Sequence, residues 1–128
     1  LNKKIKNSII VDGDLVRKYI STDLKYHLSH RKIQITRVLG LAKIILNSKI
    51  IPIISTVYLD SKTSKKAEKI GIKIIRINRN MTKVFKSHPT YKSKKNVVGR
   101  DIKYKNIKSE TIFNDTRKKF CQRLNKLI

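Results

Sequence analysis

The sequence predicts an α/β fold with three layers, in which helices cover both faces of a parallel β-sheet. Short apolar, β-branched runs alternate along the chain with segments whose apolar residues recur at three- and four-residue spacing. The order is strand, helix, strand, helix, strand, helix, which is typical of parallel strands joined by crossover helices. No repeat or linker interrupts this order, so residues 1–128 are predicted to form a single domain.

Three apolar runs are predicted to be the strands of this sheet, at residues 8–11, 50–55 and 73–77. A parallel strand that is buried on both faces is usually a continuous apolar run rather than an alternating one. Pro52 is unusual in the second run, because proline removes a hydrogen-bond donor from the ladder. A last, shorter strand is expected at residues 111–113.

Helical spacing is clearest at residues 31–47, where Ile35, Val38 and Ala42 fall on one face. Further helices are expected at residues 15–20, from about 60 to 70, at 80–85 and from 116 to about 128. Short polar side chains at the start of a helix accept hydrogen bonds from its first N–H groups. The predicted caps of this kind are Asp14, then Asp60 or Ser61, and Thr116.

The charge pattern does not favour a dedicated nucleic-acid-binding protein. The chain carries 32 Lys and Arg against 8 Asp and Glu, a formal net charge of +24. Such a charge suggests phosphate neutralisation. The lysines are scattered, however, and aromatic residues make up only 6%, without the interleaving of a stacking platform. We interpret most lysines as a solvated surface, which stays compatible with an anionic ligand.

The sequence predicts a cytoplasmic protein without a membrane partner. No apolar run approaches the ~18 residues of a membrane-spanning helix, and the first residues lack the pattern of a signal peptide. The single cysteine, Cys121, excludes an internal disulfide framework and a cysteine-based zinc site.

In open parallel sheets, ligands bind beyond the carboxyl ends of the strands, and three segments are predicted to lie there. The first is Asp12-Gly13-Asp14, followed by Arg17. Two carboxylates two residues apart can take a proton from a hydroxyl or hold Mg²⁺ through water. The plainer alternative is that Asp14 only caps the next helix.

The other two segments are the polar turn at residues 55–60 and the basic loop at residues 87–104. The hydroxyls of this turn, that of Ser55 among them, either face a ligand or belong to a capped turn. The loop is either a solvated surface or a mobile lid over a phosphate site, with Gly99 as its hinge. Its basic side chains include those of His88, Lys92, Lys94, Lys95 and Arg100, and Lys86 lies just before it.

Arginine forks bind phosphate in a bidentate way, and Arg17, Arg31 and Arg37 lie on the helices that follow the first strand. Gln34 shares a helix face with Arg31. His27 and His30 have no carboxylate or cysteine partner at the spacing of metal ligands. The chain contains none of the signatures G-x-S-x-G, H-E-x-x-H, G-x-G-x-x-G and G-x-x-x-x-G-K-[ST].

Residues 9–37 resemble the adenylylsulfate kinase (APS kinase) family of P-loop kinases. They read IIVDGDLVRKYISTDLKYHLSHRKIQITR, against a family pattern of approximately LDGD-x-x-R-x-x-L-x-x-D-L-G-[FY]-x-x-x-x-R-x-x-N-x-x-R. The matching residues are Asp12, Gly13, Asp14, Arg17, Asp23, Leu24, Tyr26, Arg31 and Arg37. Residues 95–104, KNVVGRDIKY, look like the end of the family's lid, V-x-G-[IV]-D-x-x-Y, so the resemblance spans nearly the whole chain.

The resemblance implies a P-loop kinase fold and transfer of the γ-phosphoryl group of ATP, with Mg²⁺, to the 3′-hydroxyl of adenylyl sulfate. Asp14, with Asp12 beside it, would lie at the acceptor hydroxyl, and Asp14 would also lie near Mg²⁺. Arg17 and Arg31 would bind the phosphosulfate region, and Tyr26 would stack on the adenine. The other implied substrate residues are Gln34 and Ser55, and the implied lid residues are Lys95, Gly99 and Asp101.

The chain departs from the family pattern at several positions. Gln34 stands in place of Asn, Tyr58 in place of the second Ser of S-F-I-S-P, and residues 86–91 in place of R-D-P-K-G-L-Y. These departures favour, as an alternative, a related kinase that acts on another hydroxyl, for instance in polysaccharide synthesis. A basic nucleic-acid-binding domain without catalysis is a further alternative.

The phosphate loop of the family lies upstream of its DGD motif. We therefore expect residues 1–128 to be an adenylylsulfate kinase-like domain without its first strand, its phosphate loop and most of its first helix. Such a chain is expected to be inactive by itself. The sequence leaves the true acceptor and the presence of a homodimer open.

Overall fold

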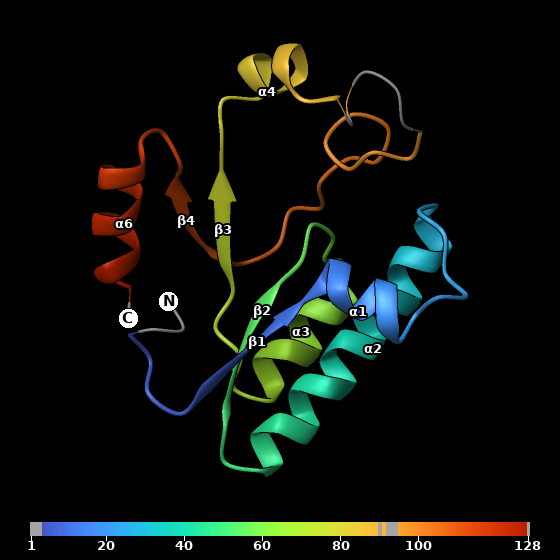
Figure 1. The fold of residues 1–128 in the computed structure, drawn as a ribbon, viewed down its shortest axis with the longest axis vertical. Helices are drawn as coiled ribbons and strands as arrows, with labels where there is room; N and C mark the ends of the chain where they lie inside the picture. Colours follow the sequence, from blue (N-terminus) through green and yellow to red (C-terminus); the bar gives the residue numbers. More distant parts are fainter. Residues whose placement is uncertain (1–3, 90, 92–94, 128) are drawn as a thin grey trace.

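The computed structural model describes residues 4–89, 91 and 95–127. Strands and helices alternate along the chain as predicted (Figure 1). The elements are β1 (Ser8–Asp12), α1 (Gly13–Tyr19), α2 (Leu28–Asn47), β2 (Ile51–Ser55), α3 (Ser61–Lys69), β3 (Ile75–Asn78), α4 (Met81–Ser87), β4 (Glu110–Phe113) and α6 (Arg117–Asn125). Every predicted strand and helix is present, and the differences lie at their ends.

The strand pairings are parallel, as predicted, but they form two ladders. In one ladder β1 pairs with β2, and in the other β3 pairs with β4. The single sheet expected for residues 8–11, 50–55 and 73–77 is thus divided, because β3 forms no ladder with β2 within the described residues. Strands that follow one another in sequence need not be neighbours in a doubly wound arrangement.

Pro52 fits into β2 because of the edge that it faces. The N–H of Ile51 donates to the carbonyl oxygen of Asn7 at 2.9 Å, which places it on the β1 side. Successive N–H groups alternate between the two edges of a strand. Position 52 therefore faces away from β1, where a missing donor removes no hydrogen bond from the β1–β2 ladder.

The cap of α1 is Asp12, and the prediction of Asp14 is wrong. The Asp12 carboxylate accepts hydrogen bonds from the N–H groups of Asp14 and Leu15, at 2.9 and 3.1 Å. The helix begins at Gly13 rather than at Leu15, so the capping position moves back along the chain. Asp60 and Thr116 cap α3 and α6, as predicted.

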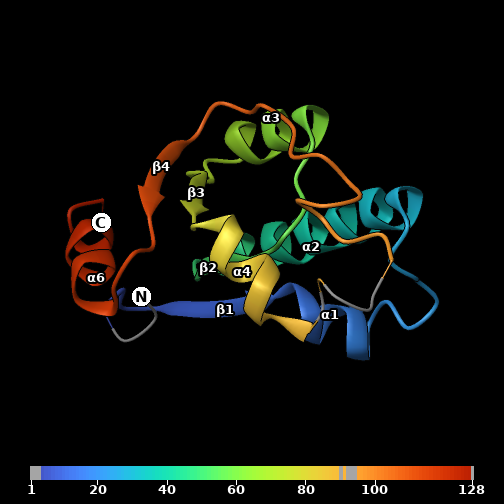
Figure 2. The same cartoon turned by 90° about the horizontal axis from the view of Figure 1, so that it is seen from above.

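The core lies between α1, α2 and the β1–β2 ladder. Figure 2 shows α2 running along this ladder, with α1 at the end of β1. The buried core residues are Val11, Val16, Ile35, Val38, Tyr58 and Val98. They come from β1, α1, α2, the turn after β2 and the loop before β4, so the carboxyl ends of β1 and β2 are held firmly together. No helix among the described residues is long and apolar enough to span a membrane.

Candidate active site

A cavity of about 60 Å³ lies beyond the carboxyl ends of β1 and β2. Its lining residues are Asp12, Gly13, Asp14, Arg17, Tyr26, Arg31, Gln34, Ile35, Ser55, Thr56, Val57 and Tyr58. The prediction that the two aspartates, Arg17, Arg31 and Ser55 share one cleft is confirmed. The sheet edge brings together residues that are more than 40 positions apart in the chain, as the parallel topology requires.

The start of α1 lies unusually close to the end of β2. A Cβ atom at position 13 would lie 2.9 Å from the carbonyl oxygen of Ser55, a distance that real Cβ contacts essentially never show. The side-chain amide of Gln34 donates to the carbonyl oxygen of Gly13 at 3.0 Å. Glycine is therefore required at position 13 for steric reasons, and the segment is held from both β2 and α2.

The two carboxylates of this segment are not equivalent. Asp12 accepts two backbone hydrogen bonds as the helix cap. The exposed Asp14 accepts no hydrogen bond at its carboxylate from the part of the chain that the structure describes. Of the two, Asp14 has the carboxylate that can accept a proton or ligate a cation without uncapping α1. Its oxygens, with the Ser55 hydroxyl on the same cavity, are donors of the type that Mg²⁺ prefers.

Two guanidinium groups lie against the ring of Tyr26. The guanidinium carbon of Arg17 is 4.7 Å from the ring centroid, and that of Arg31 is 5.7 Å from it. Arg17 Nη1 donates to the carbonyl oxygen of Lys25 at 2.9 Å, and Arg31 Nε donates to that of Tyr26 at 2.8 Å. Backbone carbonyl oxygens thus fix the orientation of both guanidinium groups. Other N–H groups of each guanidinium stay available to a ligand.

The charges of these two arginines repel each other. The pKa of Arg31 is lowered mainly by its partial burial and, to a smaller extent, by the neighbouring charge of Arg17. An anion that binds beside both forks would relieve this repulsion and replace lost hydration with charge-assisted hydrogen bonds. The electrostatics of the cavity therefore favour a ligand that carries negative charge.

Arg37 does not line the cavity, although its fork was a candidate phosphate binder. It forms two hydrogen bonds with the carboxylate of Asp23, at 2.6 and 2.9 Å. The hydrogen bond from Arg37 lowers the pKa of Asp23, and the same contact raises the pKa of Arg37. This pair joins the loop after α1 to α2, and neither of its residues lines the cavity.

His30 also supports this loop. Its Nδ1 atom accepts a hydrogen bond from the N–H of Lys25 at 2.8 Å. The pKa of His30 is lowered mainly by burial and, to a smaller extent, by the charge of His27. Within the described residues, no three His, Cys, Asp or Glu side chains gather into a metal site.

The predicted lid is docked onto the core. Val98 is only 2% exposed and belongs to the core cluster. Arg31 Nη2 donates to the carbonyl oxygen of Asn96 at 2.9 Å, which joins α2 to this loop. Gly99 has φ +91°, and the Tyr104 ring lies 2.9 Å from the place of a Cβ atom there, so the turn favours glycine. Lys95 is exposed; Lys92 and Lys94 lie outside the described residues.

Asp101 closes the turn of this loop. Its carboxylate accepts hydrogen bonds from the guanidinium of Arg100 at 2.8 Å and from the N–H of Val97 at 3.0 Å. These hydrogen bonds lower the pKa of Asp101 to about 2, and the bond from Arg100 contributes most. An aspartate in an unfolded chain titrates near ~3.9. The folded pKa is the lower one, so the carboxylate stabilises the turn above about pH 4, and this contribution is lost as the pH falls toward 2.

We expect an NMR titration to give the Asp101 carboxyl carbon a midpoint near pH 2. The substitution Arg100→Ala should raise this midpoint toward ~3.9, because the main stabilising hydrogen bond is removed. Lys103→Ala, at an exposed lysine of the same loop, should leave it unchanged. A wild-type midpoint near ~3.9 would contradict the docked turn.

The polar turn after β2, one of the three predicted segments, contributes more residues to the cavity than Ser55. Thr56, Val57 and Tyr58 line the cavity from the turn after β2. The Thr56 hydroxyl donates to the carbonyl oxygen of Tyr58 at 3.3 Å, which tightens this turn. The available signal for Tyr58 was a large aromatic residue in the polar turn that follows a strand.

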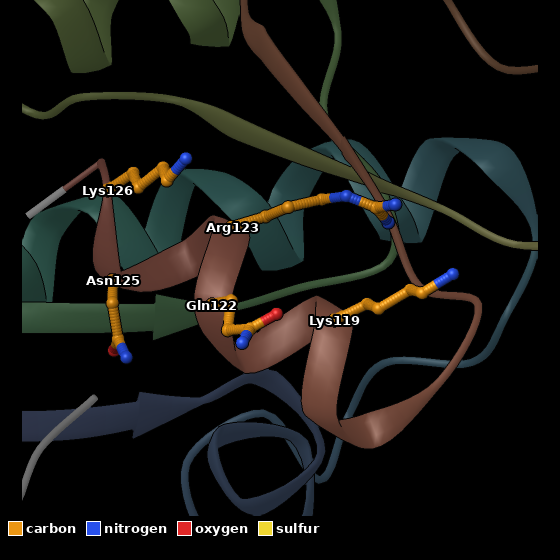
Figure 3. A pocket seen from close by; sticks show the side chains of 5 residues that line it. All are labelled: Lys119, Gln122, Arg123, Asn125 and Lys126. Carbon is orange, nitrogen blue, oxygen red and sulfur yellow. The ribbon is translucent and has the colours of Figure 1, made fainter.

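A second hollow, of about 510 Å³, lies open on α6. Figure 3 shows its lining side chains, Lys119, Gln122, Arg123, Asn125 and Lys126, which come from α6 and the residue directly after it. Arg123 already bonds to the Asp115 carboxylate at 3.0 Å. Figure 1 places α6 on the side of the molecule opposite α1. Of these two cavities among the described residues, the smaller one is the candidate active site, because it is lined by carboxylates, arginine side chains and tyrosine rings together.

The fold is that of the P-loop kinases. Among solved structures, that of the APS kinase CysC of Mycobacterium tuberculosis in complex with AMPPNP and APS is similar to this chain, with a TM-score of 0.73. The similarity covers 98% of this chain and 82% of that chain, at 15% sequence identity. The predicted α/β class with parallel strands in three layers is confirmed.

The family follows from the sequence. A family model described as adenylylsulphate kinase matches residues 1–105, and the chain belongs to this family. No curated protein matches the chain. The family is one of nucleotide-binding kinases, so the protein is of the kinase class of transferases.

Proposed function

We propose that the protein takes part in transfer of the γ-phosphoryl group of ATP to the 3′-hydroxyl of adenylyl sulfate, the kinase step of sulfate activation in the cytoplasm. One observation carries this proposal. Asp14, Arg17, Tyr26 and Arg31 line a single cavity at the carboxyl ends of β1 and β2. A carboxylate, two guanidinium forks and an aromatic ring are the groups that a nucleotide with a negatively charged tail and a reactive hydroxyl requires.

The two arginines bind the phosphosulfate region of the substrate. Their forks are oriented by the carbonyl oxygens of Lys25 and Tyr26, so little side-chain freedom is lost when an anion binds. The ring of Tyr26 is half exposed and stacks on the adenine. Gln34 and Ser55 complete the wall of the binding site.

Asp14 accepts the proton of the acceptor hydroxyl. The 3′-oxygen attacks the γ-phosphorus of ATP, the bond from that phosphorus to the β–γ bridging oxygen breaks, and ADP leaves. Asp14 is the residue that would hold Mg²⁺, which would supply positive charge beside the transferred group. Asp12 keeps α1 capped, which holds Asp14 in place.

The residues that line the cavity do not account for binding of the triphosphate of ATP. Binding of β- and γ-phosphates by kinases of this class uses a glycine-rich loop and its lysine, and residues 1–128 contain no G-x-x-x-x-G-K-[ST] sequence. We expect a polypeptide of these residues alone to bind the acceptor but not to turn over with ATP. A homodimer stays a prediction.

Calorimetric titration of the chain with adenylyl sulfate tests the proposal. We expect saturable binding with one site per chain, and a loss of affinity of about tenfold or more in Arg17→Ala, because a charge-assisted hydrogen bond is removed. Lys43→Ala, an equal loss of charge at an exposed site on α2 outside the cavity, should have little effect. Equal losses in the two variants would instead indicate non-specific attraction to the basic surface.

A related kinase that acts on another hydroxyl is the second candidate. It is favoured by Tyr58, a bulky residue that lines the cavity at a position where the family pattern has a serine. Binding of a sugar phosphate in preference to adenylyl sulfate in the same titration would support this candidate.

A further inference from the structure

We infer that His30 is a positioning residue for the two arginines of the cavity, and that it loses this role when its Nδ1 atom takes up a proton. This inference rests on the proposed function, because it concerns how the same cavity binds a negatively charged ligand. His30 lies near the start of α2, is half-buried, and is not one of the residues that line the cavity. Its effect on a ligand therefore passes through the α1–α2 loop, residues 20–27.

The peptide group between Leu24 and Lys25 in this loop is held on both sides. Its N–H, that of Lys25, donates to His30 Nδ1 at 2.8 Å. Its carbonyl oxygen, that of Leu24, accepts a hydrogen bond from Arg17 Nη1 at 3.4 Å. The next carbonyl oxygen, that of Lys25, accepts a shorter bond from the same Arg17 atom, at 2.9 Å. His30 thus holds the stretch of backbone that orients the guanidinium of Arg17.

The other arginine and the aromatic ring depend on the same stretch. Tyr26 follows Lys25 in the chain, and its carbonyl oxygen accepts a hydrogen bond from Arg31 Nε at 2.8 Å. The Tyr26 ring lies 4.7 Å from the guanidinium carbon of Arg17 and 5.7 Å from that of Arg31. A movement of the backbone at Lys25 therefore disturbs both guanidinium groups and the ring together.

The hydrogen bond from Lys25 requires the neutral form of His30. In the protonated imidazole both ring nitrogens are donors, so Nδ1 has no lone pair left for another N–H group. Protonation would bring two N–H groups face to face and break the bond. Histidine is the side chain whose charge changes in the physiological pH range, so this loss is reached under mild conditions.

The groups that face His30 oppose its protonation. The ring centroid of His27 lies 3.8 Å from that of His30. Burial first, then the charge of His27, and to smaller extents those of Lys25 and Arg17, lower the pKa of His30 below its ordinary 6.5, while Asp23 acts in the other direction. Because the pKa is lower with the loop in place, the hydrogen bond stabilises the loop in full above pH 6.5. This contribution is lost as the pH falls through the pKa of the folded state.

The pH dependence that follows is opposite to that of a simple basic surface. A lower pH makes the chain more positive, which by itself would strengthen the attraction of an anion. The loss of the backbone contacts that orient Arg17 and Arg31 weakens anion binding instead, because the two side chains must then be ordered by the ligand. Adenylyl sulfate suits the test, since its phosphosulfate group keeps the same charge over the pH range in which histidine titrates.

Calorimetric titration with adenylyl sulfate at about pH 7.5 and about pH 5.5, on either side of the ordinary histidine pKa, tests the inference. The wild type should bind about tenfold more weakly at the lower pH, the effect of about one lost hydrogen bond. In His30→Asn the side-chain oxygen can accept from the Lys25 N–H without titrating, so this variant should bind equally well at both pH values. His27→Asn removes the neighbouring histidine but leaves the acceptor, and should keep the pH dependence.

A wild-type affinity that is constant or rises at the lower pH would overturn the inference and leave the proposed function standing, as would a fall that persists in His30→Asn. No binding of adenylyl sulfate at either pH would overturn both. A thermal melt checks that the variants fold. In the wild type itself, the NMR resonance of the Lys25 amide should shift together with the titration of the His30 ring. A Lys25 resonance that stays constant during that titration would also overturn the inference.

Discussion

Arg31→Ala is expected to lower the affinity of the chain for adenylyl sulfate about a hundredfold, the largest effect of a single substitution at the site. The fork of Arg31 is partly buried and oriented by the Tyr26 carbonyl, so its contact with an anion is stronger than that of an exposed lysine. Hydrogen bonds to charged groups contribute about 1.5–3 kcal/mol each, and about 2.7 kcal/mol corresponds to a hundredfold change.

The control for this prediction is Arg37→Ala. Arg37 lies on the same helix, but its fork is bonded to Asp23 and does not line the cavity. Its removal should change the affinity only slightly. Arg31→Lys should recover little, because a single ammonium cannot replace a planar fork. Similar losses for Arg31→Ala and Arg37→Ala would contradict the assignment of Arg31 to the ligand.

Gly13→Ala is expected to destabilise the fold by about 1–3 kcal/mol, because the new methyl group cannot be accommodated without moving α1 away from β2. The obstacle is the Ser55 carbonyl oxygen, a backbone atom 2.9 Å from the Cβ position. That movement would also stretch the hydrogen bond from Gln34 to the Gly13 carbonyl. Urea unfolding measures the change in free energy.

Gly40 supplies a matched control for this substitution. It lies within α2, and a Cβ atom there would meet nothing within 4 Å. Gly40→Ala should therefore stabilise the chain by about 0.5–1 kcal/mol, since alanine favours the helix and restricts the unfolded chain. If both substitutions shifted stability in the same direction, the close approach of α1 to β2 would not be a property of the protein in solution.

The elements of the fold could be predicted because each has a local cause. The apolar spacing of α2 and the β-branched runs of β1 and β2 are properties of short segments. The division into two ladders depends on which strands meet after folding, and no local pattern carries that information. The capping residue of α1 was predicted wrongly because Asp12 and Asp14 are chemically alike. Only the residue at which the helix begins decides which of the two is the cap.

The site could be predicted where its residues follow a strand end or a family motif. Asp14, Arg17 and Arg31 were found in this way, and the cavity brings them together. Arg37 shows the limit of this reasoning, because an arginine that binds a carboxylate and one that binds a phosphate have the same sequence signal. The docking of Val98 and the buried hydroxyl of Tyr58 depend on packing between distant segments, which only the structure shows.

The central claim is that a nucleotide binds at the carboxyl ends of β1 and β2, and mapping the bound ligand by NMR tests it most directly. Adenylyl sulfate should be added to labelled chain while the amide and arginine side-chain resonances are followed. The account predicts saturable shifts at Asp14, Tyr26 and the side chains of Arg17 and Arg31, with no change at Lys119 and Lys126 on α6. Shifts confined to α6, or spread over the basic surface without saturation, would contradict it.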